Sequence, residues 1–280
     1  MYQKALVDFI AWWRAEGGTP IGRSLIQSHL KYLLDARYSW ATVNQRLSAI
    51  RKAVSVAADK TLLDLATAVE IVRIASLPRN TAARAHSLSA AEAETLINAP
   101  AISTPKGMRD RAVLALLVGC ALRTSELVKI QAEDIQKRRG QWVLENVIGP
   151  RGHTRTIAIP SWAKFALDSW LRDGQIFSGP VFRSVDRLGK VACHSLSAQS
   201  ILPIVANYGK TIGIDVKPQD LRRTCAQLCR LEGGELDQIQ LLLGHASVQT
   251  TERYLGTRRS AVPAPNGRIQ LKWRNRKLAS

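Results

Sequence analysis

Short stretches with apolar residues at helical spacing, separated by polar breaks, fill about the first 75 residues of the chain. The first stretch carries Leu6, Phe9, Ile10 and Trp13, and the second carries Leu25, Leu30, Leu33 and Leu34. Gly-Gly-Thr-Pro at 17–20 separates the two. A third stretch begins near Ser39 or Thr42, and its apolar stripe is Val43, Leu47, Ile50 and Val54. Recurrence every three or four residues predicts short amphipathic helices that share a core.

Residues 77–87 lose this periodicity. They contain Pro78, three alanines and two arginines, which is typical of a linker. Ser89 and Glu92 follow with the spacing of a helix-capping box, and apolar residues resume behind them. We therefore expect a helical domain over 1–80, a second domain over 81–260 and a tail over 261–280.

The second domain changes its pattern along its length. A long apolar helix is predicted from Lys106, followed by a turn and a short helix. Residues 141–160 have β-type composition on both sides of a Gly-Pro-Arg-Gly-His turn, which predicts a hairpin. Helical patterns return at 162–172, at 197–210 and from Leu221 to Tyr254. The expected fold class is mainly α with a small β-sheet.

The chain is strongly basic, with 40 Lys and Arg against 22 Asp and Glu and a formal net charge of +18. This excess favours a nucleic acid partner, because each phosphate neutralised by Lys or Arg releases a condensed counterion. Residues 255–280 contain no acid and seven cations: Arg258, Arg259, Arg268, Lys272, Arg274, Arg276 and Lys277. On the third predicted helix Arg46, Arg51 and Lys52 lie off the apolar stripe and together form a candidate DNA-binding surface, although a solvated helix face explains each one alone.

Membrane and secretory features are missing from the sequence. No run approaches the ~20 apolar residues of a membrane helix, and the N-terminus does not resemble a secretory signal. We expect a cytoplasmic protein without a membrane partner. Four cysteines, Cys120, Cys193, Cys225 and Cys229, show no Cys-x-x-Cys spacing and are expected to be free thiols. Cys225 and Cys229 share a helix face, and burial among apolar residues explains this pair better than a metal site does.

Four side chains far apart in the sequence carry the candidate chemistry: Arg123, Arg222, His245 and Tyr254. They lie in the segments GCALRTSEL, PQDLRRTCA, LLLGHAS and TTERYLG. Alone, each has an ordinary explanation as a helix cap, a surface charge or a packed aromatic ring. Their order and spacing together resemble the tyrosine recombinase family, which includes the phage integrases and their bacterial relatives.

The resemblance covers nearly the whole chain. It implies an N-terminal helical core-binding domain with a SAM-like fold and a C-terminal α+β catalytic domain, which clamp double-stranded DNA between them. It implies a site-specific recombinase, often of a mobile genetic element, that acts as a homotetramer on two DNA sites, with accessory DNA-bending proteins as candidate partners. Family members cleave DNA through a covalent 3′-phosphotyrosine without metal or ATP, so no cofactor is expected.

The residue types suit that chemistry. A phenol with a pKa of about 10 is a poor nucleophile at neutral pH, and nearby positive charge favours its phenolate form. Arg123 and Arg222 would supply this charge and bind the nonbridging oxygens of the phosphate. His245 would hydrogen-bond the phosphate and Tyr254 would attack it. Arg223 is a further candidate for DNA contact.

Two positions depart from the family pattern. Gln219 stands where the family usually has histidine, and glutamine can donate a hydrogen bond but cannot carry a proton near pH 7. Pro150 stands in the hairpin turn where the family usually has a lysine as general acid. Arg151 and His153 are the candidates to replace that lysine, and contact with the DNA backbone explains them equally well.

These departures keep two other functions open. One is a DNA-binding relative that has lost its general acid chemistry, and the other is topoisomerase-like cleavage of a single duplex. The tail also allows two interpretations. Residues 268–274 alternate apolar and polar positions, which predicts a strand that joins a sheet in the same or a neighbouring protomer. The second interpretation is a basic tail that only adds positive charge.

Overall fold

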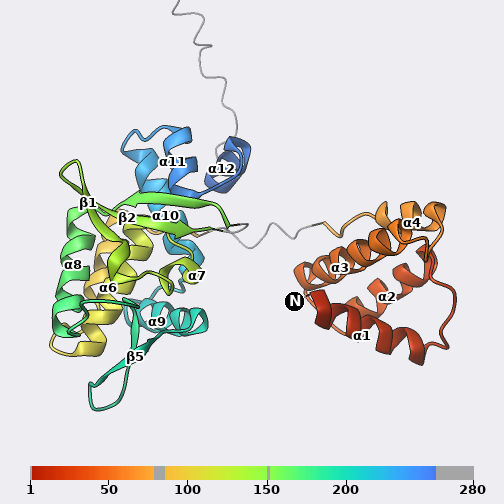
Figure 1. Ribbon diagram of the computed structural model, residues 1–280, viewed down its shortest axis with the longest axis horizontal. Coiled ribbons are helices and arrows are strands. Elements are labelled where there is room, and N and C mark those ends of the chain that lie inside the picture. Colours follow the sequence, from red (N-terminus) through yellow and green to blue (C-terminus); the bar gives the residue numbers. More distant parts are fainter. Residues whose placement is uncertain (1, 79–85, 150–151, 257–280) are drawn as a thin grey trace, which may run out of the picture. The chain divides into compact units, whose positions relative to one another are not determined.

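The computed structural model describes residues 2–78, 86–149 and 152–256. Contacts divide the chain into two compact units, Met1–Arg84 and Ala85–Ser280, which are coloured red to orange and yellow to blue in Figure 1. The strand predicted at 268–274 lies outside the described residues. Among the described residues, no helix is long and apolar enough to span a bilayer.

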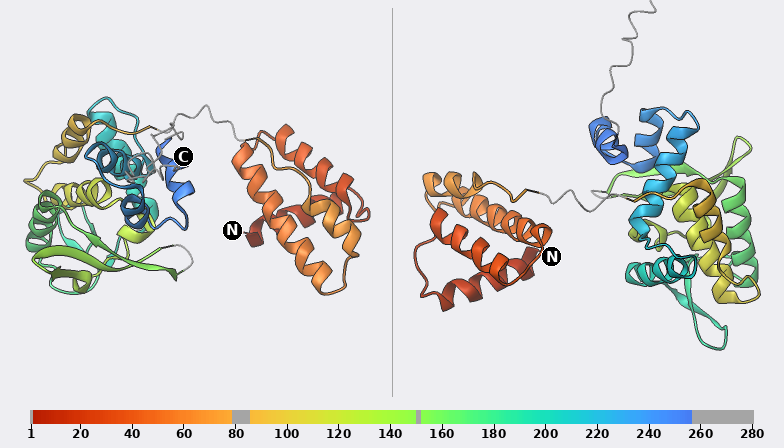
Figure 2. Two further views of the ribbon diagram at one scale, coloured as in Figure 1. Left: turned by 90° about the horizontal axis from the view of Figure 1, so that it is seen from above. Right: turned by 180° about the vertical axis from the view of Figure 1, so that it is seen from behind.

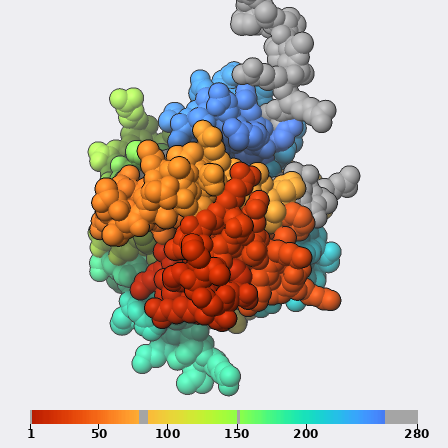
Figure 3. Space-filling view, turned by 90° about the vertical axis from the view of Figure 1, so that its right-hand side faces the viewer, coloured from red at the N-terminus to blue at the C-terminus, as the bar shows by residue number. Residues whose placement is uncertain are grey.

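The N-terminal unit is built from helices around one core. Its helices are α1 (Tyr2–Ala15), α2 (Arg23–Asp35), α3 (Trp40–Asp59) and α4 (Leu65–Val72). The long helix α3 packs against the other three, and its predicted stripe is buried. The Ser39 hydroxyl caps α3 by accepting a hydrogen bond from the Thr42 amide at 3.2 Å. Figure 3 shows one face of this unit as a continuous packed surface.

The C-terminal unit combines helices with two small sheets. Its helices are α5 (Ala90–Asn98), α6 (Pro105–Cys120), α7 (Thr124–Leu127), α8 (Ser161–Asp173), α9 (Ala198–Thr211), α10 (Pro218–Leu231), α11 (Leu236–Leu243) and α12 (Val248–Leu255), with a 3-10 turn at Ala132–Asp134. Its strands are β1 (Ile135–Arg138), β2 (Gln141–Ile148), β3 (Thr154–Ala158), β4 (Arg183–Val185) and β5 (Val191–Ser195).

Helix α6 forms the centre of this unit. Every residue from Ala112 to Val118 is buried, so the helix is apolar on all sides and must be covered by neighbours. Helices α8, α10 and α5 provide that cover, and Figure 2 shows α6 and α8 side by side. The capping box predicted at Ser89 and Glu92 is confirmed at the start of α5.

The strands form two antiparallel sheets. β1, β2 and β3 pair in that order, so the predicted hairpin is confirmed and β1 extends it. The β2–β3 register shifts between Leu144 and Val147, where Asn146 has a φ of 55°. β4 and β5 form a separate hairpin that projects from the unit in Figures 1 and 3.

The predicted fold class, mainly α with a small sheet, is confirmed. The helical stretch predicted from Leu221 to Tyr254 is not one continuous helix. Residues between Leu221 and Tyr254 form three helices, because Gly233 and Gly234 separate α10 from α11, and Gly244 ends α11 with a φ of 59°. All four cysteines are free as predicted. Cys225 is buried beside Leu243 and Leu255, whereas Cys193 is exposed.

Candidate active site

A tight turn after α6 brings Arg123 into the site. Ala121 adopts left-handed backbone angles, φ 49° and ψ 36°, which sharply redirects the chain at the end of α6. An L-residue in this region is disfavoured by about 1–2 kcal/mol, and here the surrounding contacts hold it. Ala121 is fully buried, and its carbonyl accepts a hydrogen bond from Arg222.

Arg222 lies at the base of the site. Only 1% of it is exposed, and its two terminal nitrogens donate to the carbonyls of Ala121 and Leu243. These bonds fix the guanidinium between the end of α6 and the end of α11. Burial, reinforced by the nearby charge of Arg123, lowers the pKa of Arg222 to about 10, so the group is still charged at neutral pH.

One carboxylate organises the positive charge around this point. Glu126 accepts from Arg123 Nη1 at 2.7 Å and from two nitrogens of Arg155 at 2.9 Å each, and it lies 3.9 Å from Arg222. Burial would raise the pKa of Glu126, but the hydrogen bonds from Arg155 and Arg123 outweigh it and lower the pKa. Arg155 also donates to the Leu242 carbonyl, which ties β3 to α11.

His245 follows α11 and faces the same arginines. Its Nδ1 lies 3.0 Å from the hydroxyl of Thr251, which is fully buried in α12. Burial, together with the charges of Arg222, Arg123 and Arg155, lowers the pKa of His245 to about 4. The imidazole is therefore neutral at physiological pH.

Tyr254 projects from α12 against the first turn of α10. The Gln219 amide donates to its phenolic oxygen at 3.3 Å, and the hydroxyl lies 3.4 Å from the Gln219 carbonyl. The His245 and Tyr254 rings meet edge to face, 5.3 Å between centroids. Burial raises the pKa of Tyr254, and the charges of Arg222 and Arg223 oppose this rise.

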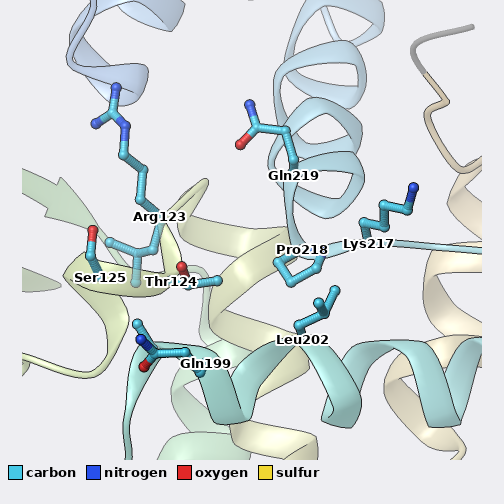
Figure 4. Close-up of a pocket in the computed structure, with 10 residues that line it drawn as sticks. Arg123, Thr124, Ser125, Gln199, Leu202, Lys217, Pro218 and Gln219 are labelled. Atoms are coloured by element: carbon cyan, nitrogen blue, oxygen red, sulfur yellow. The ribbon is translucent and has the colours of Figure 1, made fainter. Parts of the chain in front are cut away.

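Two hollows flank Arg123. The first, about 600 Å³, lies between α7, α9 and the start of α10, and Figure 4 shows Arg123 and Gln219 at its rim with Leu202 and Pro218 below. The second, about 620 Å³, is lined by Arg123, Arg155 and His245, together with Gly149 and His153. Arg123 therefore lines both hollows.

The candidate residues of the hairpin turn and of α10 are placed differently. His153 is exposed and lines the second hollow, whereas Arg151 lies outside the described residues. Arg223 has its guanidinium 4.4 Å from the centre of the Tyr254 ring and donates to the Tyr254 carbonyl, and its contact with DNA stays a prediction.

On the N-terminal unit two of the three candidate cations have partners within the protein. Arg46 forms a 2.8 Å ion pair with Asp8, and Arg51 donates to Ser76 and to the Ile74 carbonyl. Lys52 is exposed. A role in DNA binding stays a prediction for all three, and Lys52 has the most accessible charge.

Sequence reasoning missed Glu126, Arg155 and Thr251. Glu126 belongs to the same sequence segment as Arg123 and follows it by three residues. That spacing also fits a helix cap, so it does not indicate a role in the site. Arg155 contacts Glu126 across 29 residues and Leu242 across 87, and no local pattern announces such pairs. Thr251 lies three residues before Tyr254 and thus on the same helix face.

One buried guanidinium, two partly exposed ones, a neutral imidazole and a phenol around one point define the catalytic unit of a tyrosine recombinase. The chain belongs to the phage integrase family, whose sequence model matches residues 86–260.

Relatives match most of the chain. Tyrosine recombinase XerD of Xanthomonas axonopodis pv. citri is 29% identical over 273 residues, covering 90% of this chain and 84% of the relative. XerD of Pseudomonas aeruginosa is 30% identical over 263 residues, with the same coverage. Two solved structures share the fold. The XerH recombinase bound to palindromic difH substrate has a TM-score of 0.67 and 17% identity, and the match covers 84% of this chain and 69% of that one. A lambda integrase(75-356) dimer bound to a COC' core site has a TM-score of 0.62 and 19% identity, and the match covers 98% of this chain and 93% of that one.

Proposed function

We propose that this protein is a site-specific DNA recombinase that cuts and rejoins DNA through a covalent 3′-phosphotyrosine at Tyr254. The observation that carries the proposal is the contact between the Tyr254 hydroxyl and Gln219, one helical turn from the buried Arg222. The nucleophile and the cations that bind phosphate belong to the same chain and meet at one point.

Arg123 and Arg222 bind the scissile phosphate in this proposal. Arg222 uses two donors for backbone carbonyls, and because a guanidinium has five N–H groups, others stay available for phosphate oxygens. Hydrogen bonds within the protein orient both groups before substrate arrives, which lowers the reorganisation needed to stabilise the developing charge. Thr251 lies 3.0 Å from Nδ1, and in this proposal it donates to that nitrogen, so that neutral His245 carries its proton on Nε2 and donates it in a hydrogen bond to the phosphate.

The Tyr254 phenol loses its proton to solvent, its oxygen attacks phosphorus, the P–O5′ bond breaks, and the 5′ oxygen takes up a proton. Gln219 cannot accept the phenol proton and acts as a hydrogen-bond donor to the phenolate. We propose His153 as the proton donor for the 5′ oxygen, because it is exposed at the edge of the second hollow. The phosphotyrosyl ester conserves the bond energy, so rejoining needs no ATP.

The remaining partners are also proposals. The N-terminal unit holds the other side of the duplex as a core-binding domain, with Lys52 at a phosphate. A homotetramer joins two such sites, with accessory DNA-bending proteins as further partners, and the enzyme acts in the cytoplasm, where its DNA is found.

The test is covalent attachment to nicked duplexes that carry candidate sites. Wild-type protein should form a protease-resistant DNA adduct, and Tyr254→Phe should form none while its affinity for DNA changes only a few fold, because backbone contacts dominate binding. An adduct with the Phe variant would show that Tyr254 is not the nucleophile.

A second substrate examines His153 in the same assay. A 5′-bridging phosphorothiolate leaves without a proton, so it should restore the rate of His153→Ala. Equal defects on both substrates would remove His153 from the proposal.

A further inference from the structure

The C-terminal end of α12 is held by side chains from α10. The last carbonyls of a helix have no partner within it, and α12 ends at Leu255, just after Tyr254. Gly256 follows with a φ of 71°, which turns the chain away from the helix axis. Such carbonyls accept hydrogen bonds from water or from side chains outside the helix.

Arg223 and Gln227 supply such hydrogen bonds. Arg223 Nη1 donates to the Tyr254 carbonyl, and Gln227 Nε2 donates to the Leu255 carbonyl at 3.3 Å. The two residues are four apart on α10 and so lie on one face of it. They hold the last turn of α12, which carries the phenol, against the helix that supplies Arg222.

Arg223 has a second contact with the same residue. Its guanidinium carbon lies 4.4 Å from the centroid of the Tyr254 ring, within the range of a cation–π interaction. One side chain thus fixes both the backbone and the ring of Tyr254. Neither hollow beside Arg123 is lined by Arg223 among the described residues.

We infer that Arg223 is a positioning residue for cleavage, which holds Tyr254 in place for attack and keeps a positive charge against its ring. This inference rests on the proposed role of Tyr254 as the nucleophile. Gln227 supports the same helix end without supplying charge. A guanidinium is suited to both tasks, because it forms a planar fork for the carbonyl and stacks on the ring.

Charge beside the ring has a chemical consequence. A cation stabilises phenolate over phenol, so removing it makes the nucleophile harder to ionise. Among the residues that the structure describes, Arg222, Arg223 and Asp220 of α10 act electrostatically on this phenol, and the His245 ring packs against it. Of these, Arg223 alone contacts both the ring and the carbonyl of Tyr254 among the described residues.

The experiment measures single-turnover cleavage of nicked DNA at saturating DNA, as a function of pH, with binding measured in parallel. Arg223→Gln should cleave about tenfold to a hundredfold more slowly, because a displaced reacting group costs rates of this order. The ascending limb of its pH–rate profile, which reports ionisation of the phenol, should move up by about one pH unit. DNA affinity should change less than threefold.

Three further variants separate the contributions. Arg223→Lys keeps the charge without the fork, so it should retain the wild-type pH profile at a reduced rate. Gln227→Ala should slow cleavage a few fold without a pH shift. Arg253→Gln removes an exposed charge from the position just before Tyr254 and should change neither rate nor profile.

Wild-type rate and pH profile in Arg223→Gln would overturn the inference. A defect confined to binding and corrected by low salt would also overturn it and make Arg223 a DNA contact. If the Gln variant does not fold, the Lys variant decides, since a fully wild-type rate there would show that the fork is not needed. Adduct formation by Tyr254→Phe would instead remove the proposed function itself.

Discussion

Each unit contains a histidine whose pKa is lowered to about 4, and the two owe this to different surroundings. His29 in the N-terminal unit is buried among Phe9, Trp12 and Tyr32, and neither ring nitrogen has a hydrogen-bond partner in the described part of the chain. Burial and the charge of Arg46 lower its pKa, while Asp8 opposes them.

His245 has a fixed partner and an approach for substrate. Thr251 holds its Nδ1, arginines surround it, and it lines an open hollow. The contrast shows that a strongly lowered pKa does not mark a site by itself. A hydrogen-bonded second nitrogen and access to a ligand distinguish the functional histidine.

The largest expected effect is the loss of DNA cleavage when His245 is replaced. His245→Ala should slow single-turnover cleavage about 10²- to 10³-fold, as loss of a donor to transition-state charge does in other enzymes. His245→Gln, which keeps a donor, should fall between. His29→Leu serves as the matched control and should cleave bound DNA at the wild-type rate. Equal losses in the two units would remove the distinction between the two histidines.

The second effect is on stability in the N-terminal unit. Folding favours neutral His29, whereas the unfolded chain takes up a proton near its ordinary pKa of 6.5. Stability should therefore be complete above pH 6.5 and decrease by about 2–3 kcal/mol as pH falls to 4. Hydrogen exchange of α1–α3 in the whole protein, corrected for intrinsic rates, measures this loss. His29→Leu should lose most of the pH dependence, and an unchanged dependence would assign it to another group.

The smallest effect concerns the hydrogen bond between Thr251 and His245, which has no counterpart at His29 among the described residues. Thr251→Val is nearly isosteric and removes only the hydroxyl beside His245 Nδ1, so cleavage should slow by about twofold to tenfold, in line with the loss of one hydrogen bond. Thr250→Val, at an exposed neighbouring position, is the control. No difference between these variants would mean that packing alone orients His245.

Local patterns predicted much of this molecule. The stripe on α3, the capping box at Ser89 and the β2–β3 hairpin each depend on residues close in sequence, and all three are present. Glycines at 233, 234 and 244 are likewise a local signal that α10–α12 are separate helices.

Long-range contacts could not be predicted in this way. Arg46 and Arg223 appear as free cations in the sequence, yet folding places them against Asp8 and Tyr254, 38 and 31 residues away. The motifs brought the four candidate catalytic residues to attention but carried no information about their partners. Strands β1, β4 and β5 are short, and β4 and β5 pair only with each other, so the sequence gives them little periodicity.

The Glu126 cluster has a consequence for the order of charge neutralisation. Arg123, Arg155 and Arg222 share one carboxylate, His245 is neutral, and Arg223 and Asp220 beside Tyr254 offset each other, so the site carries two uncompensated positive charges. A bound phosphodiester carries one negative charge, and a phenolate that attacks it brings the second. The site therefore becomes electrically balanced only when the nucleophile is engaged with phosphorus. The charge of the site therefore matches the charge of the transition state more closely than it matches the charge of the bound DNA before attack.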